Sequence, residues 1–202
     1  MSLENDFKAL FNNMKNDPQH YTDIQFYTTI ADKIKAYVAD LVFSASSVNG
    51  SDTGPAGTFT GSASGTLFIS GSTIKAKLKE ACDKGFYMTD TDLANAFGDG
   101  LQGDVVSFNV TISGQTVTST TPPQTVTSSD SGDVTATFSS SRIKSKLITL
   151  FINMKNNPRE YDDDDFAETL ASEVVYYYTH PTTCLVQGSS HLSGSSGNGT
   201  IS

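Results

Sequence analysis

Residues 10–18 read LFNNMKNDP, and residues 150–158 read LFINMKNNP, a shift of 140 positions. The match continues without a gap through four further pairs, which are Tyr21/Tyr161, Phe26/Phe166, Thr29/Thr169 and Ala31/Ala171. Self-similarity of this length at a fixed spacing indicates an internal duplication.

A third copy lies between these two. Residues 74–78 (IKAKL) match residues 143–147 (IKSKL), and residues 88–94 (MTDTDLA) match residues 161–167 (YDDDDFA). The middle copy is four residues shorter in the connection at residues 83–87. All three copies end alike, with FIS, TFS and TIS. We therefore predict three tandem repeats, at residues 1–70, 71–139 and 140–202, which fill the chain.

Each repeat opens with two amphipathic segments. In the first repeat, the apolar positions of the first segment follow a helical spacing, and Pro18 ends that segment. Phe26, Ile30 and Ile34 then stand four residues apart, which predicts a second helix. In the second repeat the counterparts are Ile74, Leu78, Ala81 and Cys82 for the first helix and Leu93, Phe97 and Leu101 for the second. In the third repeat they are Ile143, Leu147, Leu150, Phe151 and Met154 for the first helix and Phe166, Leu170 and Val174 for the second.

Two strands are expected to follow the helices. Phe108, Val110 and Ile112 alternate with polar residues, as in a strand with one wet face. A Thr-rich second strand is predicted near the end of each repeat, at residues 66–70, 134–139 and 199–202. We expect the Gly/Ser/Thr/Pro-rich stretches between the strands to be loops, and the longest, residues 119–131, to be a flexible projection. The predicted fold class is therefore α+β, with three helix–helix–strand–strand units.

One unit of this size buries only a modest core, so neighbouring units should pack together and cover each other's strand edges. The sequence leaves two arrangements open: a linear stack, or three units around a pseudo-threefold axis.

Charge and composition exclude several classes of protein. The chain of 202 residues has a net charge of −9, which disfavours binding to nucleic acid. It contains no apolar run long enough for a signal peptide or a membrane span. Cys82 and Cys184 fall at non-equivalent repeat positions, so we interpret them as small buried hydrophobes rather than as a disulfide or metal site.

The acidic run at residues 162–165 raises the hypothesis of a calcium site. A calcium loop spaces its carboxylates around a turn with a glycine, whereas these aspartates are contiguous and a helix follows at once. The same position carries Thr22-x-x-Gln25, Thr89-x-x-Asp92 and Asp162-x-x-Asp165, the spacing of a capping box. We therefore predict helix caps and no metal site.

No catalytic site or cofactor site is predicted. His20, His180 and His191 do not recur between the repeats and have no partner at a recognisable spacing, so we expect surface or loop roles. The glycine-rich residues 61–65 lead into a strand rather than a helix and lack the lysine of a phosphate loop, so we interpret them as a turn.

Two features are candidates for partner binding. Tyr176, Tyr177 and Tyr178 are consecutive, so on a helix they cannot share one face, and at least one should point away from the core of its unit. That side chain could pack on a neighbouring repeat or contact a partner, since tyrosine is frequent at interfaces. Pro122 and Pro123 lie in the expected projection at residues 119–131.

The helix pair with Asp165-Phe166-Ala167 and Leu170-Ala171, followed by polar strands that end in GNGTIS at residues 197–202, resembles small virion structural proteins of tailed bacteriophages. In those proteins a single unit makes up much of the chain, whereas this chain has three. The resemblance implies a non-enzymatic structural or assembly protein of the neck, tail or capsid. It also implies synthesis in the host cytoplasm, location in the virion, and contacts with other virion proteins and with copies of itself.

Two other function classes remain open. Polar strands and long loops are also typical of an extracellular adhesive or carbohydrate-binding module. A hydrolytic enzyme would need a pair of acids at a useful spacing, and the sequence offers only scattered ones such as Asp99, Asp104 and Asp133.

Overall fold

The computed structural model describes residues 2–19 and 21–202, so His20 lies outside the described residues. The chain divides into two compact units. The helical unit comprises residues 1–38, 69–105 and 139–178, and the sheet unit comprises residues 39–68, 106–138 and 179–202. Each predicted repeat therefore contributes one helical segment and one strand segment, and the cores form between repeats rather than within them.

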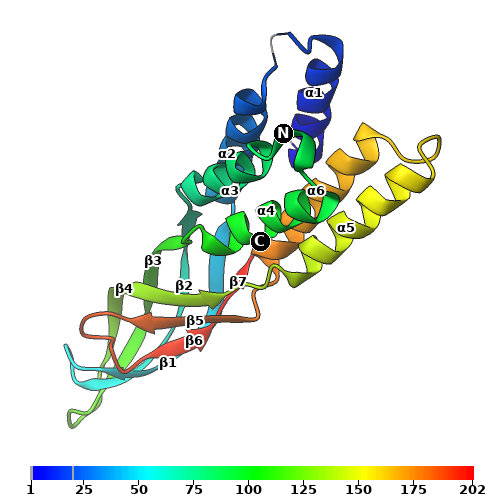
Figure 1. The fold of residues 1–202 in the computed structure, drawn as a ribbon. Helices are drawn as coiled ribbons and strands as arrows, with labels where there is room; N and C mark the ends of the chain where they lie inside the picture. Colours follow the sequence, from blue (N-terminus) through cyan, green and yellow to red (C-terminus); the bar gives the residue numbers. More distant parts are fainter. Residues whose placement is uncertain (1, 20) are drawn as a thin grey trace. The chain divides into compact units, whose positions relative to one another are not determined.

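The helical unit consists of three helical hairpins (Figure 1). The described residues contain six α-helices and one short 3₁₀ helix, in the order α1 (Leu3–Asn16), α2 (Asp23–Ala39), α3 (Ser72–Cys82), η1 (Gly85–Tyr87), α4 (Asp90–Gly103), α5 (Ser141–Asn156) and α6 (Asp163–Thr179). The stripe residues predicted from the sequence are largely buried, among them Ile30, Leu78 and Leu170. The helical spacing of the apolar residues therefore located these elements correctly.

The sheet unit is built from antiparallel strands, and the third repeat ends in two short strands where the others have one. The strands are β1 (Val42–Asp52), β2 (Gly57–Phe68), β3 (Ser107–Thr118), β4 (Thr125–Thr137), β5 (Thr183–Gly188), β6 (Ser196–Asn198) and β7 (Thr200–Ile201). The predicted helix–helix–strand–strand order is therefore seen in part: the first two repeats follow it, and the third has three strands in place of two.

The strands close into a six-stranded antiparallel barrel, which the sequence did not predict. Neighbours along the chain pair from β1 to β6, and β1 pairs on its other side with β6 and β7, which together act as the sixth strand. Closure removes both free edges of the sheet. It also places the three strand segments around an axis, so the strand pairing excludes the linear stack.

Two predicted loops are wrong, because the second strands begin earlier than expected. Residues 61–65 lie inside β2, and the connection expected at residues 119–131 is only residues 119–124, since β4 starts at Thr125. Gly61 and Gly114 face each other across β2 and β3, and a Cβ atom on either would lie within 2.8 Å of the Phe59 ring. These glycines make room for a barrel ring rather than turning the chain.

The barrel interior is apolar along most of its length. Alternate strand residues point inward, and Phe43, Val48, Phe59, Ile112 and Val186 are fully buried.

Among the described residues, no helix is both long and apolar enough to cross a membrane.

Candidate functional site

The three helical hairpins bring their turns to a common place, and the local structure there is set by helix caps. Thr89 and Asp92 form a reciprocal capping box at the start of α4. Asp162 accepts a hydrogen bond from the backbone N–H of Asp165, and its own N–H donates to the Asp165 carboxylate at 2.8 Å. The Gln25 side chain likewise accepts from the N–H of Thr22. The capping interpretation of the aspartate run is therefore confirmed.

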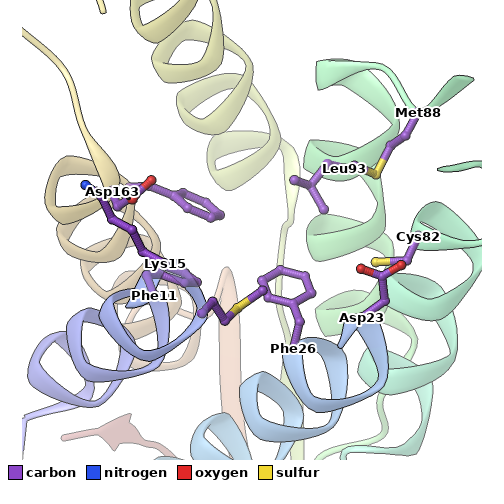
Figure 2. Close-up of a pocket in the computed structure, with 10 residues that line it drawn as sticks. Phe11, Lys15, Asp23, Phe26, Cys82, Met88, Leu93 and Asp163 are labelled. Carbon is purple, nitrogen blue, oxygen red and sulfur yellow. Dashed lines mark ion pairs between the residues drawn. The ribbon is translucent and has the colours of Figure 1, made fainter. Parts of the chain in front are cut away.

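An apolar cavity of about 490 Å³ opens between these turns (Figure 2). Phe11 and Met14 of α1, Phe26 of α2, Leu93 of α4 and Phe166 of α6 contribute to its wall. All three hairpins therefore supply side chains to one cavity. Its volume and its mostly apolar wall are typical of a site that holds a small ligand or an inserted side chain.

The cavity owes its size to small residues in the middle repeat. Alignment of the predicted repeats places Leu93 where the others have Phe26 and Phe166. It also places Cys82 where they have Phe11 and Phe151. Leu93 and Cys82 both line the cavity. The space that two phenyl rings would occupy is therefore open on one side of the hairpin cluster.

The phenyl rings of Phe11, Phe26 and Phe166 form the aromatic wall of the cavity, and they contact two further rings that do not line it. Phe11 stacks on Phe166 with ring centroids 4.9 Å apart, and Phe151 meets Phe166 edge-on at 5.3 Å. Phe97 contacts both Phe26 and Phe166 edge-on, at 6.5 and 6.1 Å. Offset and edge-to-face contacts of this kind hold the rings in place.

Charged groups stand at the cavity margin. Asp23 and Asp163 line it, and Lys15 lies 3.9 Å from Asp163. Burial raises the pKa of the Cys82 thiol to about 11, and the nearby Asp23 and Asp83 add to this effect. The Cys82 thiol is therefore protonated at neutral pH and is a poor nucleophile or metal ligand.

Large apolar side chains are exposed at positions close in sequence to residues that line the cavity. The shortened connection of the middle repeat folds into η1, where Phe86 is fully exposed and Tyr87 is 88% exposed. Met88 follows η1 and lines the cavity, and Ile24, next to Asp23 in α2, is 62% exposed. Exposed large apolar residues next to a cavity-lining residue are candidates for an interaction surface. We call Ile24, Phe86, Tyr87 and Met88 the apolar rim.

The tyrosine triplet splits between the core and the surface. Tyr177 and Tyr178 are buried and meet edge-on at 4.9 Å, and burial raises the pKa of both phenols. Tyr176 is 37% exposed, and the Arg142 guanidinium lies 3.9 Å above its ring. Arg142 also donates two hydrogen bonds to the carboxylate of the buried Glu173. Only Tyr176 of the three reaches the surface of this chain.

The other predicted partner residues, Pro122 and Pro123, are exposed in the connection between β3 and β4. This connection is held by its own hydrogen bonds: Thr118 and Gln124 pair through their backbones, and the Thr120 hydroxyl donates to the Pro122 carbonyl. It is a compact turn rather than a long projection.

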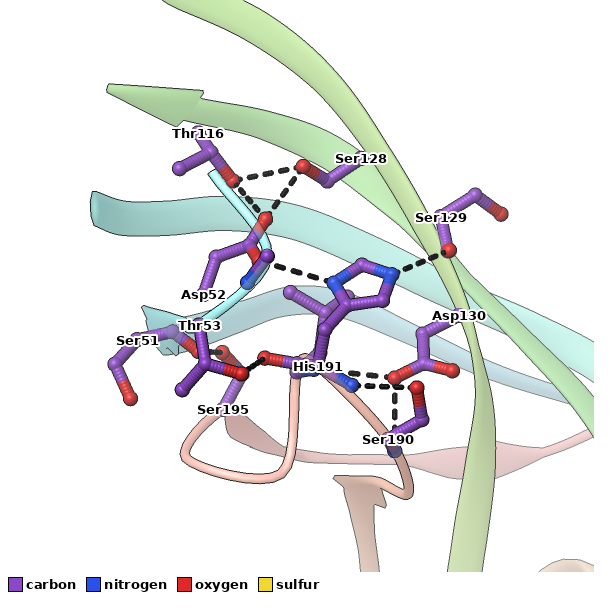
Figure 3. A network of polar contacts seen from close by, with 12 residues as sticks. Ser51, Asp52, Thr53, Thr116, Ser128, Ser129, Asp130, Ser190, His191 and Ser195 are labelled. Atoms are coloured by element: carbon purple, nitrogen blue, oxygen red, sulfur yellow. Dashed lines mark hydrogen bonds and ion pairs between the residues drawn. The ribbon is translucent and has the colours of Figure 1, made fainter. Parts of the chain in front are cut away.

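A second site, a polar network at one end of the barrel, was missed by the sequence analysis (Figure 3). Asp52, at the end of β1, is 2% exposed, and its carboxylate accepts hydrogen bonds from the hydroxyls of Thr116 and Ser128 at 2.6 and 2.5 Å. Nδ1 of His191 lies 3.0 Å from the same carboxylate. The Gly54 N–H donates to it as well. These contacts join the ends of three strand hairpins.

The His191 ring has an acceptor at each nitrogen. Nε2 lies 3.0 Å from the carbonyl oxygen of Ser129, opposite the Asp52 contact at Nδ1. The bonds to Asp52 and Ser129 raise the pKa of His191. Burial acts to raise the pKa of Asp52, but the hydrogen bonds from Ser128, Thr116, His191 and Gly54 outweigh it and lower that pKa to about 2. This geometry suits a charged, structural pair, because Nε2 faces a carbonyl rather than a hydroxyl nucleophile.

No spacing in the sequence signals this pair, since its members are 139 residues apart. Part of the apolar rim could be located from the sequence, because the repeat alignment shows the shortened connection at residues 83–87. Within residues 2–19 and 21–202, no group of three or more His, Cys, Asp or Glu side chains is arranged to hold a metal ion.

Comparison of the chain with protein-family models, with curated proteins and with solved structures gives no match in any of the three.

Proposed function

We propose that this chain is a non-enzymatic structural or assembly protein of a phage particle, located in its neck, tail or capsid, that acts through protein–protein contacts. The observation that carries the proposal is the apolar cavity of the helical unit with the apolar rim beside it. Leaving two aromatic side chains in water beside an open apolar cavity costs solvation free energy, which a docked partner recovers. The resemblance of the repeats to small virion proteins supplies the particle as the context.

We further infer that residues 1–70, 71–139 and 140–202 are diverged copies of one ancestral unit. The repeated sequence motifs and the repeated element order support this inference. A closed barrel gives the copies a reason to remain together, because one hairpin alone would expose both of its edges. A chain of three copies could match a particle ring of higher symmetry with few subunits.

Labelling of purified particles tests the proposal. The chain is expressed with an epitope tag at its C-terminus in host cells that produce the phage. The particles are then purified and stained with a gold-labelled antibody against the tag. We expect gold at a fixed position on each particle. Tag found only in the soluble host fraction, with particles bare, would contradict the proposal. Micromolar binding on a glycan array would instead favour the adhesive or carbohydrate-binding alternative.

A further inference from the structure

The electrostatics of the hairpin turns restrict what can dock at the cavity. Residues 13–26, 79–93 and 153–166, which span the three turns, contain eleven acidic and five basic side chains. This excess accounts for six of the nine net negative charges of the chain. A surface that carries most of a protein's net charge attracts groups of the opposite sign.

The basic groups near the cavity are already neutralised by neighbours. Lys15 lies beside Asp163, Lys84 lies 2.5 Å from Asp92, and Lys79 pairs with Asp83. These pairs cancel only three of the eleven acidic charges, so a docking partner would meet a net negative margin around an apolar centre. Asp23 and Asp163 line the cavity itself, and Asp163 also has Lys15 beside it, so Asp23 is the carboxylate best placed to meet a basic group near an inserted side chain.

We propose that the cavity receives an apolar side chain of a partner protein segment that is rich in Lys and Arg, an amphipathic basic segment. The apolar anchor fills the space left by Leu93 and Cys82, the rim covers its flank, and the basic side chains meet the acidic turns. The proposal rests on the proposed function, of which it specifies the partner chemistry.

A second copy of this chain fits the site poorly. Two such surfaces brought face to face would place a net charge of −6 against −6, and like charges at close range oppose association. A basic partner removes this repulsion.

Two synthetic peptides of equal length probe the site: an amphipathic Leu/Lys helix with one Phe on its apolar face, and the same peptide with every Lys replaced by Glu. Binding to the full chain is measured by fluorescence anisotropy. We expect the Leu/Lys peptide to bind, with an affinity that falls as salt rises, and the Leu/Glu peptide not to bind.

Leu93→Phe separates cavity binding from non-specific attraction. It restores the ring that the other repeats carry at this position and changes no charge. We expect it to weaken binding of the Leu/Lys peptide about tenfold, because the anchor side chain loses its place. Unchanged affinity would overturn the proposal, since it would mean that charge alone holds the peptide.

The charge contribution is tested by Asp23→Asn/Asp163→Asn against the matched control Asp32→Asn/Asp133→Asn, which removes two exposed carboxylates that do not line the cavity. We expect about threefold weaker binding for the first variant and little change for the second. Circular dichroism verifies that both remain folded. Equal weakening by both variants would overturn the local role of Asp23 and Asp163.

Other occupants give different results. Concentration-dependent dimerisation that Phe86→Ser/Tyr87→Ser abolishes would identify a second copy and overturn the proposal, as would binding to zwitterionic lipid vesicles that this variant abolishes. The virion assignment and the basic partner can be refuted independently. Particles that carry the chain, together with no binding of the Leu/Lys peptide, would overturn only the basic partner. Peptide binding by a chain that is absent from particles would overturn only the virion assignment.

Discussion

Each of the two units contains three hairpins, but the turns of the strand hairpins are closed by polar contacts, whereas the turns of the helical hairpins surround an open apolar cavity. In the barrel, the ends of the strand hairpins are closed by Asp52 and His191, whose polar atoms are all matched by neighbours. In the helical unit, the turns surround an apolar cavity with aromatic side chains exposed beside it. A closed, fully hydrogen-bonded end stabilises the fold, whereas an open apolar end leaves free energy to be gained by binding. The closed end of the barrel therefore contributes stability, and the open turns of the helical unit are the candidate for recognition.

Of the substitutions considered, removal of the Asp52 carboxylate from the closed end should lower the stability of the chain the most. Asp52→Ala leaves the Thr116 and Ser128 hydroxyls and the His191 ring without their shared acceptor. We expect the free energy of unfolding to fall by about 2–4 kcal/mol, because the buried hydroxyls lose their charged hydrogen-bond acceptor. Urea titration followed by circular dichroism measures it. The exposed Asp133 of β4 supplies the control, Asp133→Ala, which should change stability by less than about 0.5 kcal/mol. An equal, small loss in both variants would show that the network adds nothing.

Gly114→Val should destabilise the barrel wall by less. A side chain at this position would collide with the Phe59 ring and with the Gly61 backbone. Overpacking of this kind costs about 1–3 kcal/mol. Thr111→Val on the exposed face of the same strand is the control, since it places a valine in β3 where the side chain meets no collision. A Gly114→Val barrel as stable as the Thr111→Val barrel would refute the role given to this glycine.

At the open end, Leu93→Phe should act in the opposite direction. The added ring contacts the phenyl wall and removes apolar surface from water, so we expect a gain of about 1 kcal/mol in the free energy of unfolding. Thermal unfolding of the purified chain measures the gain, and Leu93→Met, which keeps the volume, is the control. A loss of stability would mean that the cavity is not shaped for a ring, and the contrast between the two ends would weaken.

The helical unit could be predicted largely from the sequence, because its information is local. The apolar stripes of α1 and α2 follow one helical period, and the caps at Thr89 and Asp162 lie within three residues of their partners. The repeat alignment made these short signals stronger by showing them three times.

The barrel could not be predicted to the same degree. Its closure depends on pairing β1 with β6 and β7, about 150 residues later in the chain, and periodicity along one strand does not contain that information. Gly61 was interpreted as part of a turn because glycine serves both turns and close packing, and only the position of Phe59 distinguishes them. The Asp52–His191 pair is non-local in the same way.

The smallest expected effect is a pH dependence of the closed end. The pKa of His191 is raised above its ordinary value of 6.5, so the stability that the protonated ring contributes is complete below about pH 6.5 and is lost as pH rises through the raised pKa. The pKa of Asp52 is lowered from 3.8 to about 2, so its contribution is complete above pH 3.8 and is lost only as pH falls toward 2. Both contributions are therefore present together in mildly acidic solution, between about pH 4 and pH 6.5.

We therefore expect the free energy of unfolding to decline as pH rises from about 6 to about 9, and His191→Gln to remove most of that decline. The charged groups facing the His191 ring are Asp52 and Asp130, both of which stay ionised over this range, so the ring is the titrating member of the cluster. His180→Gln is the control and should keep the decline, because His180 lies in the connection between α6 and β5 and is not the histidine that contacts Asp52. If wild type and His191→Gln show the same slope, the ring is neutral in the folded barrel, and the closed end depends on the hydroxyl contacts of Asp52 alone.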